Sequence, residues 1–360
     1  MMRKVLLARG TVLLALTSLL SAFALVSCGD DGAAPIDFPV SADEPALETD
    51  PAALEAGLRC TEFTHPDKPA VLLVHGTFTA GFEQYNWTYL PLLAERGYDV
   101  CTVTYPDRGL GDMQISAEYI VHALRRMHAE TGRKVAVIGH SQGVAVPRWA
   151  IRWWASARNA VDDFVLLAGP NHGTEVVTLG GVFPILTAVG LVPEVVYQLA
   201  PDSQFMAATN AGDETPGDIS YSAIYTQFDE LVRPVEPVPT AALEFGQDNP
   251  KVANILLQDV CPGRIVDHVT IGLTDRLTFD LVIDALEHEG PANVLRAGGM
   301  GLCGLAPIIP EQIIAPQAVQ GLISVLREEP ANGLPQLHPS DTEPPLKPYA
   351  QDAVPASPAP

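Results

Sequence analysis

A serine inside a Gly-x-Ser-x-Gly pattern is the side chain of this sequence best suited to nucleophilic chemistry. Ser141 lies between Gly139 and Gly143; a β-branched run over 135–138 precedes it, and an apolar pattern with helical spacing follows. A strand, this pattern and a helix in that order predict a nucleophile elbow, in which the glycines leave room for neighbouring backbone. Because a helix N-terminus offers free N–H groups to an anion, we expect the amide of Gln142 to be an oxyanion donor.

An acid and then a histidine after the serine would complete a hydrolytic site. Asp229 comes just after an expected strand, and His268 comes just after the next one. In this interpretation Ser141 attacks an acyl carbon, His268 takes and returns the proton, and Asp229 orients the imidazole. Asp267 is adjacent to His268, but neighbours on a strand point to opposite faces, so we expect it to be a poor orienting group. The alternative is a solvated or locally bonded His268.

A second oxyanion donor is expected where another strand ends. The apolar run 71–75 leads into Gly76 and Thr77. A Gly-containing loop at this edge of a sheet can present a backbone N–H, and in Thr77 also a hydroxyl, to developing negative charge. An ordinary turn at Gly76 and Thr77 is the alternative. We expect His75 to be structural.

Strands alternate with helices along the chain, which predicts an α/β protein with a mostly parallel, doubly wound sheet and helices on both faces. Several strands are apolar throughout, as buried parallel strands are. We expect strands at 71–75, 99–104, 134–138, 164–168, 219–225 and 264–267. We expect helices at 87–96, 113–131, 144–157 and 275–288. Ligands bind such sheets at the carboxyl ends of the strands, where Ser141 stands.

The N-terminus has the pattern of an export signal. Its basic residues are Arg3, Lys4 and Arg9. An apolar run over 11–26 follows, and its end, Leu25-Val26-Ser27-Cys28, resembles a bacterial lipobox. This pattern predicts a signal peptide over 1–27 and a lipid-modified Cys28. Acyl chains on Cys28 would anchor the protein to an outer membrane or cell surface without spanning it. Plain secretion with an unmodified thiol is the alternative.

Composition divides the rest of the chain. Residues 28–57 are rich in Asp, Glu, Ala and Pro without a hydrophobic period, which predicts a disordered tether. We expect the catalytic domain over 58–330 and a Pro-rich extension over 331–360. The chain carries 43 acidic and 21 basic side chains and a net charge of -22, which argues against nucleic acid as a partner.

Cysteine usage bounds the redox and metal chemistry. Apart from Cys28, the cysteines are Cys60, Cys101, Cys261 and Cys303. An even number in an exported chain favours disulfides, and four cysteines allow three pairings. Because no two of them form a Cys-x-x-Cys pair, we expect no zinc site. Catalysis by an activated serine requires no metal or cofactor, and none is expected.

Five blocks of sequence resemble the Candida antarctica lipase B-like serine lipases of the α/β-hydrolase superfamily. The blocks lie at 74–81, 140–143, 225–234, 261–268 and 343–350. The resemblance implies an α/β-hydrolase fold and a serine lipase or carboxylesterase. It implies a triad of Ser141, Asp229 and His268 and an oxyanion hole at Thr77 and Gln142. It also implies the disulfide pairs Cys60 with Cys101 and Cys261 with Cys303.

The sequence also departs from this family. His140 stands where the family has a tryptophan on the alcohol side of the pocket, so we expect that side to differ in size and polarity. Thr342 occupies a position of a further disulfide, so we expect a looser tail from Ala331 onward. The apolar segments 176–199 and 308–326 could wall an acyl site or be ordinary core helices. We expect a short cover near 176–211.

These observations predict an exported, lipid-anchored and monomeric serine lipase or carboxylesterase. It would hydrolyse carboxylic esters with apolar acyl chains through an acyl-enzyme on Ser141. One alternative is an esterase for polyesters or short acyl chains. Another is a surface-binding lipoprotein that keeps the fold without catalysis, and an extracellular protein is the alternative to the membrane anchor.

Overall fold

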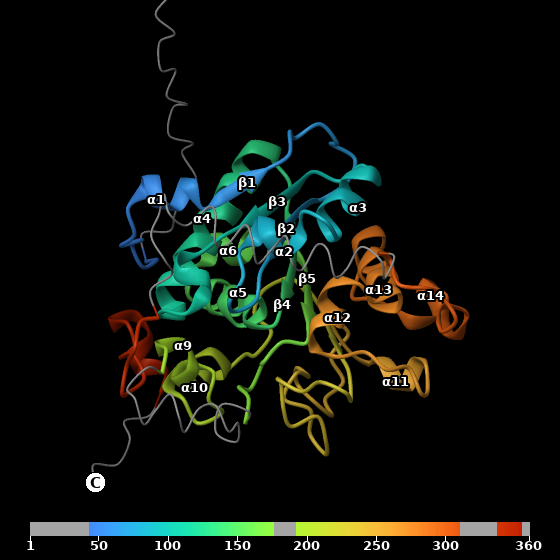
Figure 1. The fold of residues 1–360 in the computed structure, drawn as a ribbon. Helices are drawn as coiled ribbons and strands as arrows, with labels where there is room; N and C mark the ends of the chain where they lie inside the picture. The colour runs from blue at the N-terminus through green and yellow to red at the C-terminus, as the bar shows by residue number, and fades with distance from the viewer. Residues whose placement is uncertain (1–42, 176–191, 310–336, 355–360) are drawn as a thin grey trace, which may run out of the picture. The chain divides into compact units, whose positions relative to one another are not determined.

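A seven-stranded sheet forms the centre of the protein (Figure 1). The computed structural model describes residues 43–175, 192–309 and 337–354. The strands are β1 (Leu58–Cys60), β2 (Ala70–Val74), β3 (Val100–Val103), β4 (Val135–His140), β5 (Val161–Leu167), β6 (Ser220–Tyr225) and β7 (Val252–Leu256). They lie in the order β1-β3-β2-β4-β5-β6-β7, and only the β1–β3 pair is antiparallel. This order confirms the predicted mostly parallel sheet.

Helices connect most of the strands. The longer α-helices are α4 (Met113–Thr131), α5 (Gln142–Trp153) and α13 (Arg276–Glu287). The shorter ones are α1 (Pro51–Ala56), α2 (Gly81–Tyr85), α3 (Tyr89–Glu95), α6 (Ala155–Asn159), α9 (Glu194–Gln198), α10 (Gln204–Asn210), α11 (Leu257–Val260), α12 (His268–Leu273) and α14 (Val294–Ala297). The 3-10 turns are η1 (Pro106–Gly109), η2 (Gly299–Leu302) and η4 (Pro348–Ala353).

The two faces of the sheet bury separate hydrophobic cores. Alternate side chains of a strand point to opposite faces. Leu72 of β2 accordingly belongs to a core with residues of α4 and α5, whereas its neighbour Leu73 belongs to a core with residues of α3 and α13. All five residues of β2 are buried, as expected for a central parallel strand. The prediction of helices on both faces is therefore confirmed.

The strand predicted at 264–267 is wrong. That segment is a loop leading into α12, and the seventh strand of the sheet is β7, which was not predicted; neither was β1. The physical reason is a helix cap: the carboxylate of Asp267 accepts from the backbone N–H of Thr270 (2.7 Å), and the Thr270 hydroxyl accepts from the N–H of Asp267 (3.1 Å). Such a capping box starts a helix. Asp267 is therefore the N-cap of α12. Because the segment is not a strand, the expectation that Asp267 and His268 point to opposite faces of a sheet does not apply.

The folded domain begins before the predicted boundary at Leu58. Asp50 caps α1, and Leu54 within it is 3% exposed. Upstream of α1, the carboxylate of Glu44 forms an ion pair with Arg125 of α4 (2.7 Å). The acidic composition of this segment had predicted a tether to residue 57, but these contacts attach its described part, from residue 43, to the core. The predicted signal peptide and Cys28 lie outside the described residues.

The described part of the C-terminal extension also packs on the domain. Ala350 is fully buried, and the indole N–H of Trp149 in α5 donates to the hydroxyl of Tyr349 (3.2 Å). The carboxylate of Glu343 accepts from the backbone N–H groups of Gln204 and Phe205 (2.8 Å each), at the start of α10. These contacts hold the tail on the domain, although Thr342 stands where a cysteine would be needed for a further disulfide.

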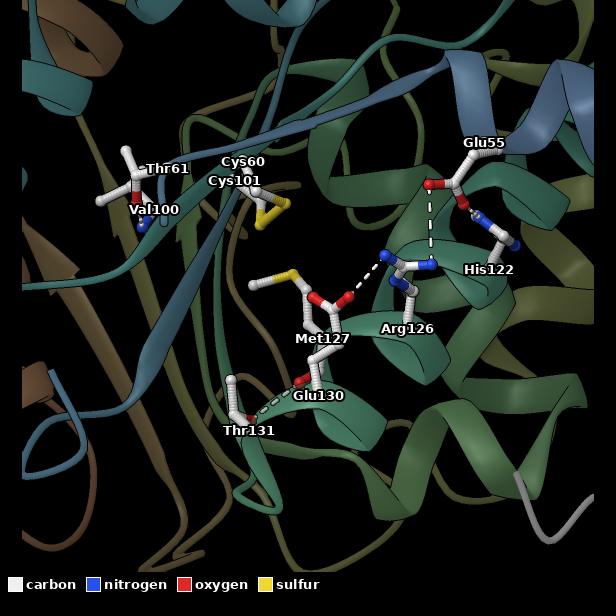
Figure 2. The surroundings of a disulfide bond; sticks show 10 residues. All are labelled: Glu55, Cys60, Thr61, Val100, Cys101, His122, Arg126, Met127, Glu130 and Thr131. Carbon is white, nitrogen blue, oxygen red and sulfur yellow. Dashed lines mark hydrogen bonds and ion pairs between the residues drawn. A yellow bond between two sulfur atoms is a disulfide. The ribbon is translucent and has the colours of Figure 1, made fainter. Parts of the chain in front are cut away.

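Two disulfides join the cysteines in the pairs that the family resemblance implies. Cys60 of β1 is bonded to Cys101 of β3, directly opposite it in the strand register (Figure 2). Beside this bridge the N–H of Val100 donates to the Thr61 hydroxyl (3.0 Å). Cys261, after α11, is bonded to Cys303, after η2. Among the described residues no helix has the length and apolarity needed to cross a bilayer.

Candidate active site

Ser141 occupies a sharp turn between β4 and α5. Its φ of 58° and ψ of -127° are costly for a residue with a side chain. The turn also brings backbones into contact, since a β-carbon on Gly139 would lie 2.1 Å from the carbonyl oxygen of Gly143. A β-carbon on Gly143 would lie 2.3 Å from the carbonyl oxygen of Val74 in β2. The glycines of the pattern are therefore required by close packing.

A continuous hydrogen-bonded path joins Ser141, His268 and Asp229. The Oγ of Ser141 lies 2.9 Å from His268 Nε2, and His268 Nδ1 lies 2.9 Å from Asp229 Oδ2. Because a carboxylate only accepts, Nδ1 carries the ring proton and Nε2 is left to accept from the serine hydroxyl. His268 is 3% exposed and Asp229 is 2% exposed.

The carboxylate of Asp229 is held by the loop after β6. Its Oδ1 accepts from the backbone N–H groups of Leu231 (2.9 Å) and Val232 (2.7 Å). These two hydrogen bonds fix the orientation of the buried carboxylate toward His268. The first residue of α12 is held from the same loop, because the N–H of His268 donates to the carboxylate of Glu230 (3.0 Å).

Thr77 and Gln142 lie in contact beside the elbow. Gln142 is the first residue of α5, so its N–H has no partner within the helix. No backbone hydrogen bond found among the described residues uses the N–H of Thr77. The Thr77 hydroxyl donates to the side-chain oxygen of Gln142 (2.8 Å). Two backbone donors are thus available at this end of the sheet, while the hydroxyl is engaged with Gln142.

A cavity of about 420 Å³ opens above these groups. Ser141, His268 and Thr77 line it, together with apolar side chains that include Leu110, Val195, Val196, Leu199 and Leu231. The apolar residues of α9 and Leu199 belong to the segment 176–199 that was predicted to wall an acyl site. Residues 176–191 of the predicted cover and 310–326 of the second apolar segment lie outside the described residues. Within the described part of the chain, no group of three or more potential metal ligands was found.

One residue of this cavity, Gln84, was not recognised as functional from the sequence. His140, which the family resemblance singled out, lines the cavity, and the side chain of Gln84 in α2 also reaches it. Gln84 donates from Nε2 to His140 Nδ1 (3.3 Å). The position of His140 next to Ser141 was a usable signal, whereas the five residues of α2 show no pattern that marks Gln84.

Another histidine, His75, has a structural place, as predicted. It is fully buried, its ring stacks on Tyr105 with centroids 3.9 Å apart, and its Nδ1 lies 2.7 Å from the carbonyl oxygen of Gly76. Burial lowers the pKa of His75 to about 4, so the ring stays neutral.

Known lipases are similar to this chain in sequence and in fold. The lipase B of Pseudozyma antarctica is 28% identical over 318 residues, which is 86% of this chain and 88% of that protein. The crystal structure of Aspergillus fumigatus lipase B matches with a TM-score of 0.72 at 25% identity, over 86% of this chain and 74% of that one. The chain is a lipase B-like ester hydrolase with the α/β-hydrolase fold.

The family described as Lipase (class 2) matches residues 67–244 of this lipase B-like chain. That stretch contains Thr77, Ser141 and Asp229, and His268 follows it. The substrate class of a lipase B-like hydrolase is an ester or lipid, which agrees with a largely apolar cavity next to a hydrogen-bonded serine.

Proposed function

We propose that Ser141 is the nucleophile, His268 the general base and acid, and Asp229 the orienting carboxylate of an acyl-enzyme mechanism. The observation that carries this proposal is the path of 2.9 Å contacts from Ser141 Oγ to His268 Nε2 and from His268 Nδ1 to Asp229 Oδ2, at the wall of an apolar cavity. The serine hydroxyl is a weak nucleophile until a base takes its proton, and the path supplies that base.

The reaction proceeds in two steps. In the first, Ser141 Oγ attacks the ester carbon while its proton moves to His268 Nε2, and the tetrahedral intermediate then expels the alcohol, which receives this proton. In the second, His268 Nε2 takes a proton from water as the water attacks the acyl-enzyme, and returns that proton to Ser141 Oγ when the acid leaves. Asp229 stabilises the charged imidazole in both steps.

The backbone N–H groups of Thr77 and Gln142 act as the oxyanion hole. Negative charge develops on the former carbonyl oxygen only in the tetrahedral state, so donors aimed at it favour the transition state over the substrate. One such donor contributes on the order of 10²–10³ in kcat. The free N–H at the start of α5 supports this role for Gln142.

Esters with apolar acyl chains are the proposed substrates. Leu110, Val195, Val196 and Leu199 give the cavity a wall without charge, which favours the burial of an alkyl chain. Short-chain esters and polyesters are the competing substrates, and a binding role without catalysis is the competing function.

Hydrolysis of p-nitrophenyl butyrate and p-nitrophenyl palmitate by the purified protein tests the proposal. We expect Ser141→Ala and His268→Ala each to lose ~10³-fold or more in kcat, with unchanged thermal unfolding. The ratio of the two chain lengths separates a lipase from a short-chain esterase. A folded protein inert on both esters would exclude simple ester hydrolysis and favour polyester hydrolysis or binding, which polyester film would then separate.

We further propose that the protein is exported as a monomer and anchored by acyl chains on Cys28. The two disulfides support an oxidising compartment. In this proposal residues 1–27 are the signal peptide, and the tether from Cys28 ends before Glu44, whose ion pair with Arg125 holds the chain to α4. Mass spectrometry of the mature protein and of Cys28→Ser tests it. The acylated mass and membrane fractionation should both be lost in the variant, and an unmodified Cys28 in the parent refutes the anchor.

A further inference from the structure

A second hydrogen-bonded chain runs behind the proposed triad. The backbone N–H of Gly76 donates to Gln84 Oε1 (3.0 Å), Gln84 Nε2 donates to His140 Nδ1 (3.3 Å), and His140 Nε2 donates to the carbonyl oxygen of His268 (2.8 Å). The direction of each bond is determined by its ends, because an amide N–H only donates and a carbonyl oxygen only accepts. The chain joins the loop after β2 to the first residue of α12.

The members of this chain are held in place by close packing. Gln84 and His140 are each 6% exposed. A β-carbon on Gly272 would lie 2.2 Å from His140 Cδ2, so the second turn of α12 rests directly on the imidazole. Burial, and then the charge of the nearby His268, lower the pKa of His140 to about 3. The neutral ring keeps the lone pair on Nδ1 that accepts from Gln84.

We propose that Gln84 and His140 are positioning residues that hold the oxyanion loop and the general base in register. Gly76 directly precedes Thr77, and His268 carries the base, so the chain connects the two halves of the site that must act on one carbonyl group. Displacement of a reacting group by ~1 Å can cost ~10²-fold in rate. The inference rests on the proposed function of Ser141, His268 and Thr77.

A simpler role for both residues would be to shape the cavity, which they also line. The leaving alcohol receives its proton from His268, and the His140 ring lies 5.0 Å from the His268 ring, so in this simpler role His140 would contact the alcohol. A wall residue therefore affects only acylation, and its effect depends on the alcohol. A positioning residue affects acylation and deacylation alike, because both steps use His268 and the oxyanion hole.

Pre-steady-state hydrolysis of p-nitrophenyl butyrate separates the two steps. The burst of p-nitrophenol reports acylation, and the following steady rate reports deacylation. We expect His140→Phe, which keeps a planar ring without hydrogen bonds, and Gln84→Met, which keeps the length of the side chain, each to lower both rate constants by ~10-fold or more. His140→Gln, which retains an N–H donor, should recover part of the loss.

The double variant is the internal control. If the two residues act through one chain, the variant with both Gln84→Met and His140→Phe loses no more than the worse single variant, whereas independent effects multiply. Thr342→Val, at an exposed position outside the cavity lining, serves as the matched control for substitution alone and should leave both rate constants at the parental values.

Three outcomes overturn the inference: an unchanged deacylation rate, a loss that varies with the alcohol of the ester, or multiplied losses in the double variant. Thermal unfolding of each variant shows that the sites compared are folded, and Gln84→Met provides the test if His140→Phe does not fold. Ser141→Ala, measured alongside, distinguishes the two failures. An active Ser141→Ala refutes the proposed function itself, whereas an inactive Ser141→Ala with a fully active His140→Phe refutes only the positioning role.

Discussion

Removal of the Cys261–Cys303 disulfide should impair catalysis as well as stability. The two residues are 42 positions apart, and His268 lies within the loop that they close. Closing a loop of this length restricts the unfolded chain enough to stabilise the fold by about 4 kcal/mol. The Cys60–Cys101 bridge closes a loop of nearly equal length, with a separation of 41, so the same argument gives it a similar contribution of about 4 kcal/mol.

The two bridges differ in what they hold. Cys60 and Cys101 are opposite each other in paired strands, so the backbone ladder keeps their surroundings in place without the sulfur bond. The segment from Cys261 to His268 has no strand pairing. We therefore expect Cys261→Ser with Cys303→Ser to lower kcat several-fold at 25 °C, and Cys60→Ser with Cys101→Ser to leave it near the parental value.

The assay combines urea unfolding with hydrolysis of p-nitrophenyl butyrate. Activity is compared at temperatures where both double variants remain more than nine-tenths folded by circular dichroism, so that loss of folded protein does not contribute. Equal activities for the two variants would refute the argument that the second bridge positions His268. A loss of unfolding free energy below about 1 kcal/mol in both would refute the loop-closure magnitude.

Three further predictions follow from individual contacts. Gly143→Ala should abolish activity or folding, because its β-carbon would lie 2.3 Å from a backbone oxygen. Gly301→Ala, whose β-carbon would have no atom within 4 Å, should behave as the parent in the same esterase and unfolding assays. An active Gly143→Ala would contradict the close packing of the elbow. Thr77→Val and Gln142→Leu each remove the same side-chain hydrogen bond and keep both backbone N–H donors. Each variant should therefore lower kcat by a similar factor of ~10. A much larger loss in Thr77→Val would mean that the Thr77 hydroxyl itself binds the oxyanion. Burial raises the pKa of Asp163 to about 7, so the folded state binds a proton on this carboxyl group more tightly than the unfolded chain does. The free energy of unfolding should therefore fall as pH rises from about 4 to about 7. Asp163→Asn should flatten this pH dependence of the unfolding midpoint, and parallel curves for the two proteins would refute the prediction.

Local patterns in the sequence predicted the parts of this fold that local interactions determine. The helix expected at 113–131 coincides with α4, which begins at the cap Asp112 and ends at Gly132 in a left-handed conformation. The strand ends that carry Thr77 and Ser141 were also found, since apolar β-branched runs followed by glycine are local signals. The strand expected at 264–267 failed because an Ile-Val pair suggested extended backbone, while the decisive contact was the cap between Asp267 and Thr270.

The residues that support the proposed triad could not be predicted from local sequence patterns, because their contacts join distant parts of the chain. The chain through Gln84 and His140 joins residues separated by 8, 56 and 128 positions, so no short window of sequence contains more than one of its links. The first and last links also depend on a backbone group, which every residue possesses and which therefore leaves no mark in the sequence. The same holds for Glu44, whose acidic segment predicted a tether but whose carboxylate is paired with Arg125. It also holds for Glu343 of the Pro-rich extension, whose carboxylate accepts from the N–H groups that begin α10. A charged side chain can be assigned to solvent or to a cap only when its partner is known, and that partner is supplied by the fold.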